Sequence, residues 1–370
     1  MVHVDKKVAT FILGEGCNLY CDYCLMDDAK DGKSKEIDLD FAKKGMDDFF
    51  EGRPDIFGFC NTKIRFYSMG EPTMQMPLIQ DLAEYARTKV GDSLQIELQT
   101  NGFFSPGIAE WIAKNVAVTW VSLDGPADVQ DSLRKTRDGK SVRNIVERNI
   151  KRLLEEPNIV VGVRPTITAA NNTRQKEMIR YFDSLGIKNV WTHHEFTPVG
   201  DNNEVLNSPV AAISLLEYAQ NYVDSYRVAE EAGIFYGSFL GVNFDEACRH
   251  HCRACLPMPH FTLDGAVSSC DMAYSKDTKF KDLIFGEWKD ETKEIVYFPD
   301  RINKLRARTV ESIAECVECE VSSNCGGGCL GEAYYETGSM NGIRPDHCEA
   351  VKYLAEHLPR NQGRFPLHHP

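Results

Sequence analysis

Three cysteines near the start of the chain have the spacing of a metal-binding loop. Cys17, Cys21 and Cys24 form a C-x3-C-x2-C pattern directly after a short apolar run. Soft thiolates select iron–sulfur clusters or zinc. A structural zinc site closes with a fourth protein ligand, which nothing in this loop supplies. The loop therefore predicts a cubane iron–sulfur cluster held at three corners, with its fourth iron open.

An aromatic residue, Tyr23, stands immediately before the third cysteine. With it, the loop resembles the radical S-adenosylmethionine (SAM) superfamily. The resemblance implies a 4Fe-4S cluster whose open iron chelates SAM, and reductive cleavage of SAM to a 5'-deoxyadenosyl radical. Tyr23 and Met26, which follows the loop, are then expected at the SAM pocket.

Apolar, β-prone runs alternate with helical patterns over the first two thirds of the chain. Such alternation predicts parallel βαβ units, whose sites collect at the C-terminal ends of the strands. The resemblance implies an α/β fold in which six units form a partial (β/α)6 TIM-like barrel. Strands are predicted at residues 8–13, 63–67, 94–98, 116–123, 159–167 and 189–192, and helices at 40–50, 77–90, 108–115, 142–154, 174–185 and 209–232.

A Gly-Glu-Pro sequence follows the second predicted strand. A glycine lets the backbone approach a ligand, and a carboxylate accepts hydrogen bonds from an ammonium group. The position resembles the G-G-E-P motif of the radical SAM family, which implies that Gly70 and Glu71 contact the SAM amino group. Met69 replaces the first glycine of that motif, which puts the backbone contact there in doubt. A plain turn is the alternative.

Polar residues also follow the third and fourth predicted strands. Asn101 lies in Thr-Asn-Gly, and Ser122 and Asp124 lie in Ser-Leu-Asp-Gly. Both sequences resemble family segments that line the SAM pocket, and Ser122 and Asp124 are suited to accept hydrogen bonds from ribose hydroxyls. Arg134 resembles the family's arginine for the SAM carboxylate, with Arg137 as the alternative. A generic turn at Asn101 and solvent-exposed arginines are the competing interpretations.

The last third of the chain has a different composition. Nine of the thirteen cysteines follow Gly233, and the regular alternation ends there. This change predicts a barrel domain at 1–233 and a cysteine-rich domain at 234–370.

The thiols of the second region have a specific spacing. An Asp264-Gly265 pair between two β-prone runs predicts a hairpin that brings Cys255 and Cys270 to the same end. With five later cysteines they resemble the C-terminal SPASM extension of the radical SAM superfamily, which holds two auxiliary 4Fe-4S clusters. The resemblance implies one cluster on Cys316, Cys319, Cys325 and Cys348, and another on Cys255, Cys270, Cys329 and a fourth ligand. We prefer Cys252 as that ligand for its C-x2-C spacing to Cys255, with Cys248 second.

Four further residues have possible roles. Asp271 directly follows Cys270, and a carboxylate beside a cluster can serve as the catalytic general base. Sulfatase-maturating members of the family are acidic there; a structural aspartate is the alternative. His193 and His194 are adjacent on a predicted strand and should point to opposite faces, which disfavours a shared metal. Cys60 is interpreted as a small buried hydrophobe.

The composition excludes several partners. The net charge of -13 argues against nucleic acid or an anionic membrane. No apolar run is long enough for a membrane span, and no signal peptide is evident, which predicts a cytoplasmic protein. In a reducing compartment the cysteines are expected to be metal ligands rather than disulfides.

Together these features predict a radical SAM/SPASM oxidoreductase that modifies a residue of a peptide or protein, a maturase of ribosomally made peptides (RiPP type) that works under anaerobic conditions. A flavodoxin- or ferredoxin-type protein would supply electrons. Sixteen residues precede Cys17, so leader recognition is expected from a separate protein or from the barrel itself.

Three alternatives stay open. An anaerobic sulfatase-maturating enzyme shares the layout, but Leu25-Met26 and Tyr67-Ser68-Met69 depart from its expected sequences. A small-molecule radical SAM enzyme is the second alternative. The third is a non-catalytic iron–sulfur electron carrier, which the retained Glu71, Ser122 and Asp124 disfavour.

Overall fold

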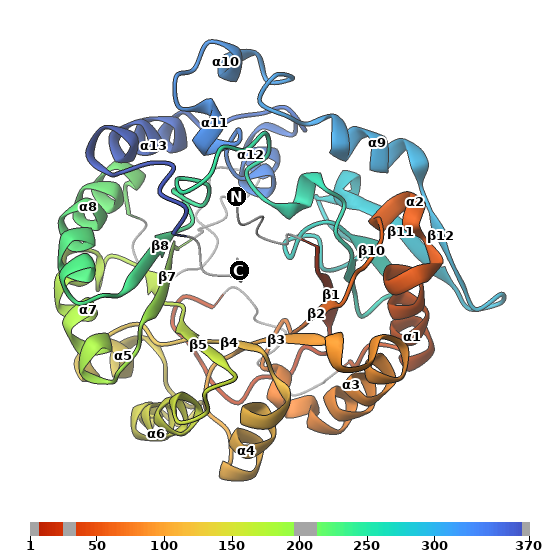
Figure 1. The fold of residues 1–370 in the computed structure, drawn as a ribbon, viewed down its shortest axis with the longest axis horizontal. Helices are drawn as coiled ribbons and strands as arrows, with labels where there is room; N and C mark the ends of the chain where they lie inside the picture. Colours follow the sequence, from red (N-terminus) through yellow and green to blue (C-terminus); the bar gives the residue numbers. More distant parts are fainter. Residues whose placement is uncertain (1–6, 25–34, 196–212, 365–370) are drawn as a thin grey trace.

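The computed structural model describes residues 7–24, 35–195 and 213–364. Met26 and the start of the helix predicted at 209–232 lie outside the described residues. In Figure 1 the strands of the first part form an open arc around the centre, and the helices that connect them lie outside it. The strands of the first part are β1 (Ala9–Ile12), β2 (Lys63–Tyr67), β3 (Gln95–Thr100), β4 (Val118–Val121), β5 (Val160–Val163), β6 (Thr166–Ile167), β7 (Asn189–His194) and β8 (Phe235–Ser238).

These strands pair in parallel in the order β1-β2-β3-β4-β5-β7-β8. The parallel sheet with its outer helices confirms the predicted α/β class and partial barrel. The connecting helices are α1 (Leu39–Asp47), which continues as a π-helix over Asp48–Gly52, α2 (Pro54–Phe57), α3 (Met76–Val90), α4 (Pro106–Asn115), α5 (Ala127–Leu133), α6 (Arg143–Leu154), α7 (Gln175–Ser184) and α8 (Leu215–Glu231).

Local sequence explains where these helices begin and end. Asp38 caps α1 by accepting a hydrogen bond of 2.8 Å from the Phe41 amide, which satisfies a free N–H of the first turn. Ser214 caps α8 in the same way. Gly91 ends α3 at a φ of +59°, a conformation that favours glycine.

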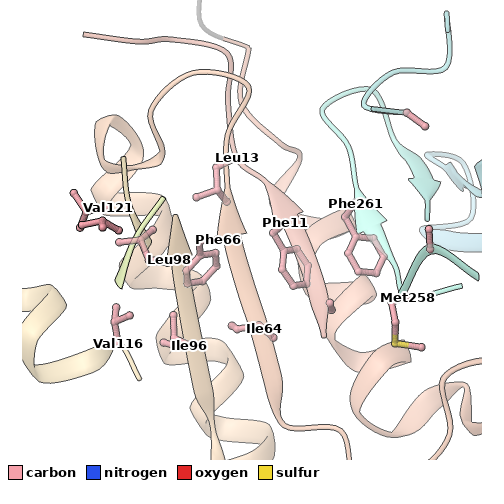
Figure 2. Packing of buried hydrophobic residues seen from close by; sticks show 14 of the residues in the cluster. Phe11, Leu13, Ile64, Phe66, Ile96, Leu98, Val116, Val121, Met258 and Phe261 are labelled. Carbon is pink, nitrogen blue, oxygen red and sulfur yellow. The ribbon is translucent and has the colours of Figure 1, made fainter. Parts of the chain in front are cut away.

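Apolar side chains on the outer face of the sheet form the core. Phe11, Phe66 and Leu98 occupy paired positions on β1, β2 and β3, and Figure 2 shows them side by side. Helix α1 covers this face so closely that a Cβ at Gly45 would lie 2.5 Å from the ring of Phe261. Because successive strand residues point to opposite faces, the alternate positions face the interior of the barrel.

The inner face of β1, β2 and β3 is charged. Lys63 and Glu97 form a buried ion pair of 2.9 Å. The Arg65 Nε donates to the Thr10 Oγ1 at 3.1 Å, and Arg65 is 1% exposed. A buried arginine needs polar partners, so this face is built to hold charge.

The C-terminal region extends the same sheet. Strands β9 (His260–Phe261), β10 (Ala266–Ser268), β11 (Ile284–Lys289) and β12 (Glu294–Tyr297) pair antiparallel in sequence order. This pairing confirms the hairpin predicted around Asp264-Gly265. Strand β9 pairs in parallel with β1, and the Phe261 ring stacks on Phe11 at 4.9 Å. The remaining helices are α9 (Pro299–Ala307), α10 (Ala314–Val317), α11 (Ser322–Cys325), α12 (Leu330–Thr337) and α13 (Pro345–His357), the last packed on α8.

Helices α2 and α5 were not predicted, and two features of the sheet also differ from the sequence expectations. The strand predicted at 159–167 is interrupted at Arg164-Pro165, where proline cannot donate to the ladder; β5 and β6 keep the same register along β7 on either side. Strand β8 follows Gly233 yet belongs to the parallel sheet. The domain division at Gly233 stays a prediction. In the described part of the chain, no helix combines the length and apolar character needed to span a membrane.

Candidate active site

The cysteine loop leaves β1 and packs against the segment that follows β2. The Met69 amide donates to the Gly14 carbonyl at 3.0 Å, and the Glu71 amide donates to the Gly16 carbonyl at 2.8 Å. A Cβ at Gly70 would lie 2.1 Å from the Gly16 carbonyl oxygen. Gly70 is therefore required by the close approach of the cysteine loop. Its predicted SAM contact stays a prediction.

The three thiols of this loop surround one cavity of about 200 Å³ at the C-terminal ends of the strands. Burial raises the pKa of Cys17 to about 11 and the pKa of Cys21 to about 12. Both thiols would therefore stay protonated on their own, and a bound cationic iron centre is what stabilises thiolates in such a place. The donor set, three thiols and no fourth ligand from the loop, fits a cluster with one open iron.

Glu71 ties the loops after β2 and β3 together. Its Oε1 accepts hydrogen bonds from Thr73 and from the Thr100 hydroxyl at 2.6 Å, and its Oε2 accepts from the Asn101 amide at 2.6 Å. The Asn101 side chain in turn donates to Asn18 at 2.8 Å and stands 3.9 Å from the Cys17 sulfur. Burial raises the pKa of Glu71. Glu71 and Asn101 thus both line the cavity and hold the cysteine loop.

Asp124 holds Arg134 and Tyr23 in place. Its Oδ2 accepts from the Tyr23 hydroxyl and the Arg134 Nε, both at 2.7 Å, and its Oδ1 accepts from the Thr166 amide at 2.9 Å. Asp124 is fully buried and does not line the cavity, whereas Tyr23 and Arg134 do. Although burial lowers the pKa of Arg134, the charge of Asp124 raises it well above its ordinary value. Asp124 therefore positions cavity residues, and its predicted ribose contact stays a prediction.

Of the other residues predicted to bind SAM, some line the first cavity and one does not. Ser122 lines the cavity, as predicted, and so does Arg134, whose Nη1 stands 3.9 Å from the Cys21 sulfur. Arg137, the alternative to Arg134, is exposed and does not line it. Tyr67 and Gln99 line the cavity too and were missed by motif reasoning. Their positions at the inner-facing ends of β2 and β3 are the signal that could have found them.

A second, central cavity of about 250 Å³ adjoins the first. Tyr67 and Gln99 line both, so the two cavities share a wall. Its opposite side carries the thiols of Cys252, Cys270 and Cys329. This arrangement places the central cavity between the cysteine loop and one group of C-terminal thiols.

Asp271 lines this central cavity beside Cys270. Its Oδ1 forms an ion pair with Arg65 and lies 3.1 Å from the His260 Nε2, and 35% of its side chain is exposed. Burial raises its pKa, but Arg65 and His260 together hold the pKa well below its usual range. Asp271 is thus an ionised partner of Arg65, and such a carboxylate is a weak base. Its predicted role as general base stays a prediction.

A third cavity, of about 410 Å³, lies between α11 and α13. Five thiols line it: Cys316, Cys319, Cys325, Cys329 and Cys348. The neighbouring Gly326 adopts a φ of +68°, and a Cβ there would lie 2.3 Å from the His251 amide nitrogen. Glycine at this position therefore lets two backbone segments meet beside the thiols.

Most of the C-terminal thiols lie on two cavities, and Cys329 lines both. Cys252, Cys270 and Cys329 line the central cavity. Cys316, Cys319, Cys325 and Cys348 line the third cavity together with Cys329. The Cys248 amide donates to the Ser323 carbonyl at 2.6 Å. The choice between Cys252 and Cys248 as the fourth ligand, and the ligand sets themselves, stay predictions.

Within the described residues, no three Cys, His, Asp or Glu side chains stand close enough to hold one metal ion. The thiols surround cavities, which fits clusters because each thiolate binds a different iron. Cys60 is exposed at a φ of +61°, so its interpretation as a buried hydrophobe is wrong; the chain turns there instead of entering the core.

The rings of the adjacent histidines stack on each other with their centroids 5.0 Å apart, so the expectation that they point to opposite faces is wrong. His193 lines the central cavity, whereas His194 is buried with its Nε2 3.3 Å from a carboxylate oxygen of Glu332. Burial lowers the pKa of His193 to about 3, so this ring is neutral. The two rings do not share a metal site among the described side chains.

Comparison with known proteins identifies the class of this site. Residues 11–179 match the model of the Radical SAM superfamily, which covers the cysteine loop and the cavity residues after β2, β3 and β4. Residues 11–179 of this chain therefore form a radical SAM domain. This family implies a 4Fe-4S cluster and SAM, and the residues around the first cavity fit both.

Two relatives are similar to most of the chain. The radical SAM cyclopropyl synthase TigE of Paramaledivibacter caminithermalis is 20% identical, with 95% of this chain and 74% of the relative covered. A cysteine-type anaerobic sulfatase-maturating enzyme of Clostridium perfringens is 23% identical, with 85% of this chain and 86% of the relative covered.

Two solved structures share the fold. The structure of anSMEcpe with bound AdoMet has a TM-score of 0.72 at 18% identity, covering 95% of this chain and 93% of that one. Streptococcus suis SuiB bound to the precursor peptide SuiA has a TM-score of 0.63 at 16% identity, covering 94% and 76%.

Proposed function

We propose that this protein is a radical SAM enzyme of the SPASM type that oxidatively modifies a residue of a peptide or protein. The observation that carries the proposal is the central cavity, which shares Tyr67 and Gln99 with the SAM cavity and ends at Cys252, Cys270 and Cys329. A substrate residue in this cavity lies between a radical source and a group of thiols able to hold an electron-accepting cluster.

The bound cluster and SAM supply a 5'-deoxyadenosyl radical that removes a hydrogen atom from carbon. The chain's own residues bind and orient. Arg134 is held by Asp124 to receive the SAM carboxylate, Ser122 lies ready for a ribose hydroxyl, and Tyr67 separates the two cavities. The surrounding wall excludes water, which protects a reactive radical from side reactions.

In this proposal two auxiliary clusters occupy the C-terminal thiols. One takes Cys252, Cys255, Cys270 and Cys329, and the other takes Cys316, Cys319, Cys325 and Cys348. A flavodoxin- or ferredoxin-type donor delivers electrons, and a separate leader-binding protein or the barrel itself recognises the substrate. Because such clusters react with oxygen, the enzyme works under anaerobic conditions in the cytoplasm.

A peptide substrate is supported by two comparisons. Solved neighbours were crystallised with peptides: anSMEcpe with Kp18Cys and SuiB with SuiA. A second candidate function is maturation of a sulfatase, since the chain spans 86% of the sulfatase-maturating relative's length and has an acidic residue after Cys270.

The test is anaerobic. The cluster-loaded protein is given SAM and dithionite, and 5'-deoxyadenosine is quantified; then peptides encoded by short reading frames beside the gene, and a sulfatase peptide, are added. Loss of two hydrogens from a gene-neighbour peptide supports the proposal, and conversion of the sulfatase peptide supports the second candidate. No 5'-deoxyadenosine under any condition would contradict both.

A further inference from the structure

The acidic groups of the central cavity already have partners. Asp271 is paired with Arg65 and accepts from His260. The other acid, Glu332, is 2% exposed, and its Oε2 accepts from the Arg344 Nη1 at 2.7 Å. Both carboxylates are therefore neutralised from within the protein.

Two cationic side chains of the same cavity have no such partner. The Arg164 Nη1 donates to the neutral side chain of Gln99 at 2.8 Å. Arg253 makes no side-chain hydrogen bond or ion pair with any of the described residues. The nearest other acid on the inner face, Glu97, is paired with Lys63 at 2.9 Å. Asp271 and Glu97 also interact electrostatically with Arg164 and Arg253, but each of these acids already has its own ion-pair partner. The described side chains of this region therefore carry two more positive than negative charges.

Arg164 and Arg253 reach the central cavity from two different elements. Arg164 projects from the interruption between β5 and β6, and Arg253 lies in the short turn between Cys252 and Cys255. His193, which lines the same cavity, is neutral and adds no positive charge, so the two arginines alone account for the excess. Burying guanidinium groups without partners is unfavourable, which makes an anionic ligand the natural complement.

We propose that Arg164 and Arg253 bind a carboxylate of the substrate in the central cavity, beside the carbon that is modified. The inference rests on the proposed function and names its substrate class: a peptide that presents either an acidic side chain or its C-terminal carboxylate at this point. An arginine fork matches the two oxygens of a carboxylate. A substrate without this group would leave both cations unpaired and is rejected for that reason.

The alternative role of Arg253 is to donate hydrogen bonds to a predicted cluster, because its neighbours Cys252 and Cys255 are assigned to that cluster. Arg308 is better placed for that role. Its Nη1 lies 3.9 Å from the Cys255 sulfur, and its Nη2 donates to the Gly327 carbonyl at 2.9 Å. The Arg253 side chain faces the cavity instead. A spectroscopic control separates the two roles.

The experiment uses four libraries of N-acetylated random hexapeptides. Two end in a free carboxylate and two in an amide, and within each pair one library contains Asp and Glu while the other has Asn and Gln in their place. Immobilised cluster-loaded protein is exposed to each library without oxygen, with SAM and without reductant. Bound peptides are then quantified by mass spectrometry.

We expect at least tenfold enrichment of carboxylate-bearing peptides over the library that has none. Enrichment of Asp and Glu identifies a side-chain carboxylate, and enrichment of free C-termini identifies the chain end. Arg164→Gln and Arg253→Gln should each reduce the enrichment roughly tenfold, and Arg→Lys should restore part of it. Arg180→Gln, an exposed arginine on α7, is the matched control and should behave as the wild type.

Several results would overturn the inference. These are no preference for carboxylates, an unchanged preference in both Gln variants, or weaker SAM binding by either variant. Altered iron content or visible absorption in Arg253→Gln would assign this arginine to the cluster and overturn its substrate role. Dithionite-driven formation of 5'-deoxyadenosine is measured in parallel, since its absence contradicts the proposed function, whereas its presence without carboxylate preference contradicts the inference alone.

Discussion

Replacing Asp124 with Asn tests whether this carboxylate acts through Arg134. Each carboxylate oxygen accepts from Arg134, at 2.7 Å from Nε and 3.3 Å from Nη2. Whichever way the new amide turns, its nitrogen faces an arginine N–H that cannot accept. The loss of one hydrogen bond to a charged group costs about 1.5–3 kcal/mol. Because Arg134 is only 7% exposed, the unpaired charge raises the expected total to about 3–5 kcal/mol of unfolding free energy.

The same variant distinguishes a role of Asp124 in positioning Arg134 from a direct contact of Asp124 with the ribose. If Asp124 positions Arg134 for the SAM carboxylate, Asp124→Asn should weaken SAM binding by roughly tenfold and leave 5'-deoxyadenosine unaffected, because that nucleoside has no carboxylate. Equilibrium dialysis of the cluster-loaded protein measures both affinities. Ser122→Ala, the control for a ribose contact, should weaken both ligands. Equal weakening of the two ligands by Asp124→Asn, or a stability change below about 1 kcal/mol, would refute the reasoning.

Three further predictions concern the cysteine loop, the thiol groups and a buried carboxylate. Gly70→Ala should destabilise the protein by about 1–3 kcal/mol and lower iron incorporation, because its Cβ would lie 2.1 Å from a loop carbonyl; Gly107→Ala, where the nearest atom is 4.0 Å away, should do neither. Cys17→Ala should abolish 5'-deoxyadenosine formation, while Cys316→Ala should spare some of it and stop product, as chromatography of the reaction would show; full activity of Cys17→Ala would contradict the site. Burial raises the pKa of Asp245 to about 6 from 3.8, so its protonated form stabilises the fold below pH 4 and this contribution is lost as the pH rises through 6. Chemical unfolding at pH 5 and pH 7.5 should therefore show a loss of about 1.4 kcal/mol that Asp245→Asn lacks, and identical pH profiles would count against it.

Much of the barrel could be predicted because its strands are short apolar runs with clear turn signals between them. Strand β2 begins and ends where the sequence indicated, and β5 differs only by the break at Pro165. Strand β8 was missed, since Phe235–Ser238 is short and contains Gly237, which a strand pattern disfavours. That glycine is needed because a Cβ would lie 2.4 Å from the ring of Trp191, a contact that no local pattern reveals.

The site was predictable where spacing encodes chemistry and unpredictable where distant strands meet. The cysteine motifs identified the thiol groups, and the motifs after β2 and β3 identified Glu71 and Asn101. The hydrogen bond between Asp124 and Tyr23 joins residues 101 positions apart, and no local pattern reveals such a contact. Arg164 and Arg253 carry no motif, and only the folded sheet places them on one cavity.

The parallel pairing of β1 with β9 has a consequence for how the chain is made. Strand β1 emerges early from the ribosome, yet its partner lies near residue 260, and the hydroxyl of Tyr297 donates to Asp48 from 249 residues away. At about 5–20 residues per second, the outer edge of β1 waits roughly ten seconds or longer for its neighbour. During that interval Phe11 and an unpaired strand edge are open to association with other nascent chains, so a chaperone that shields this edge should decide how much protein reaches the folded state.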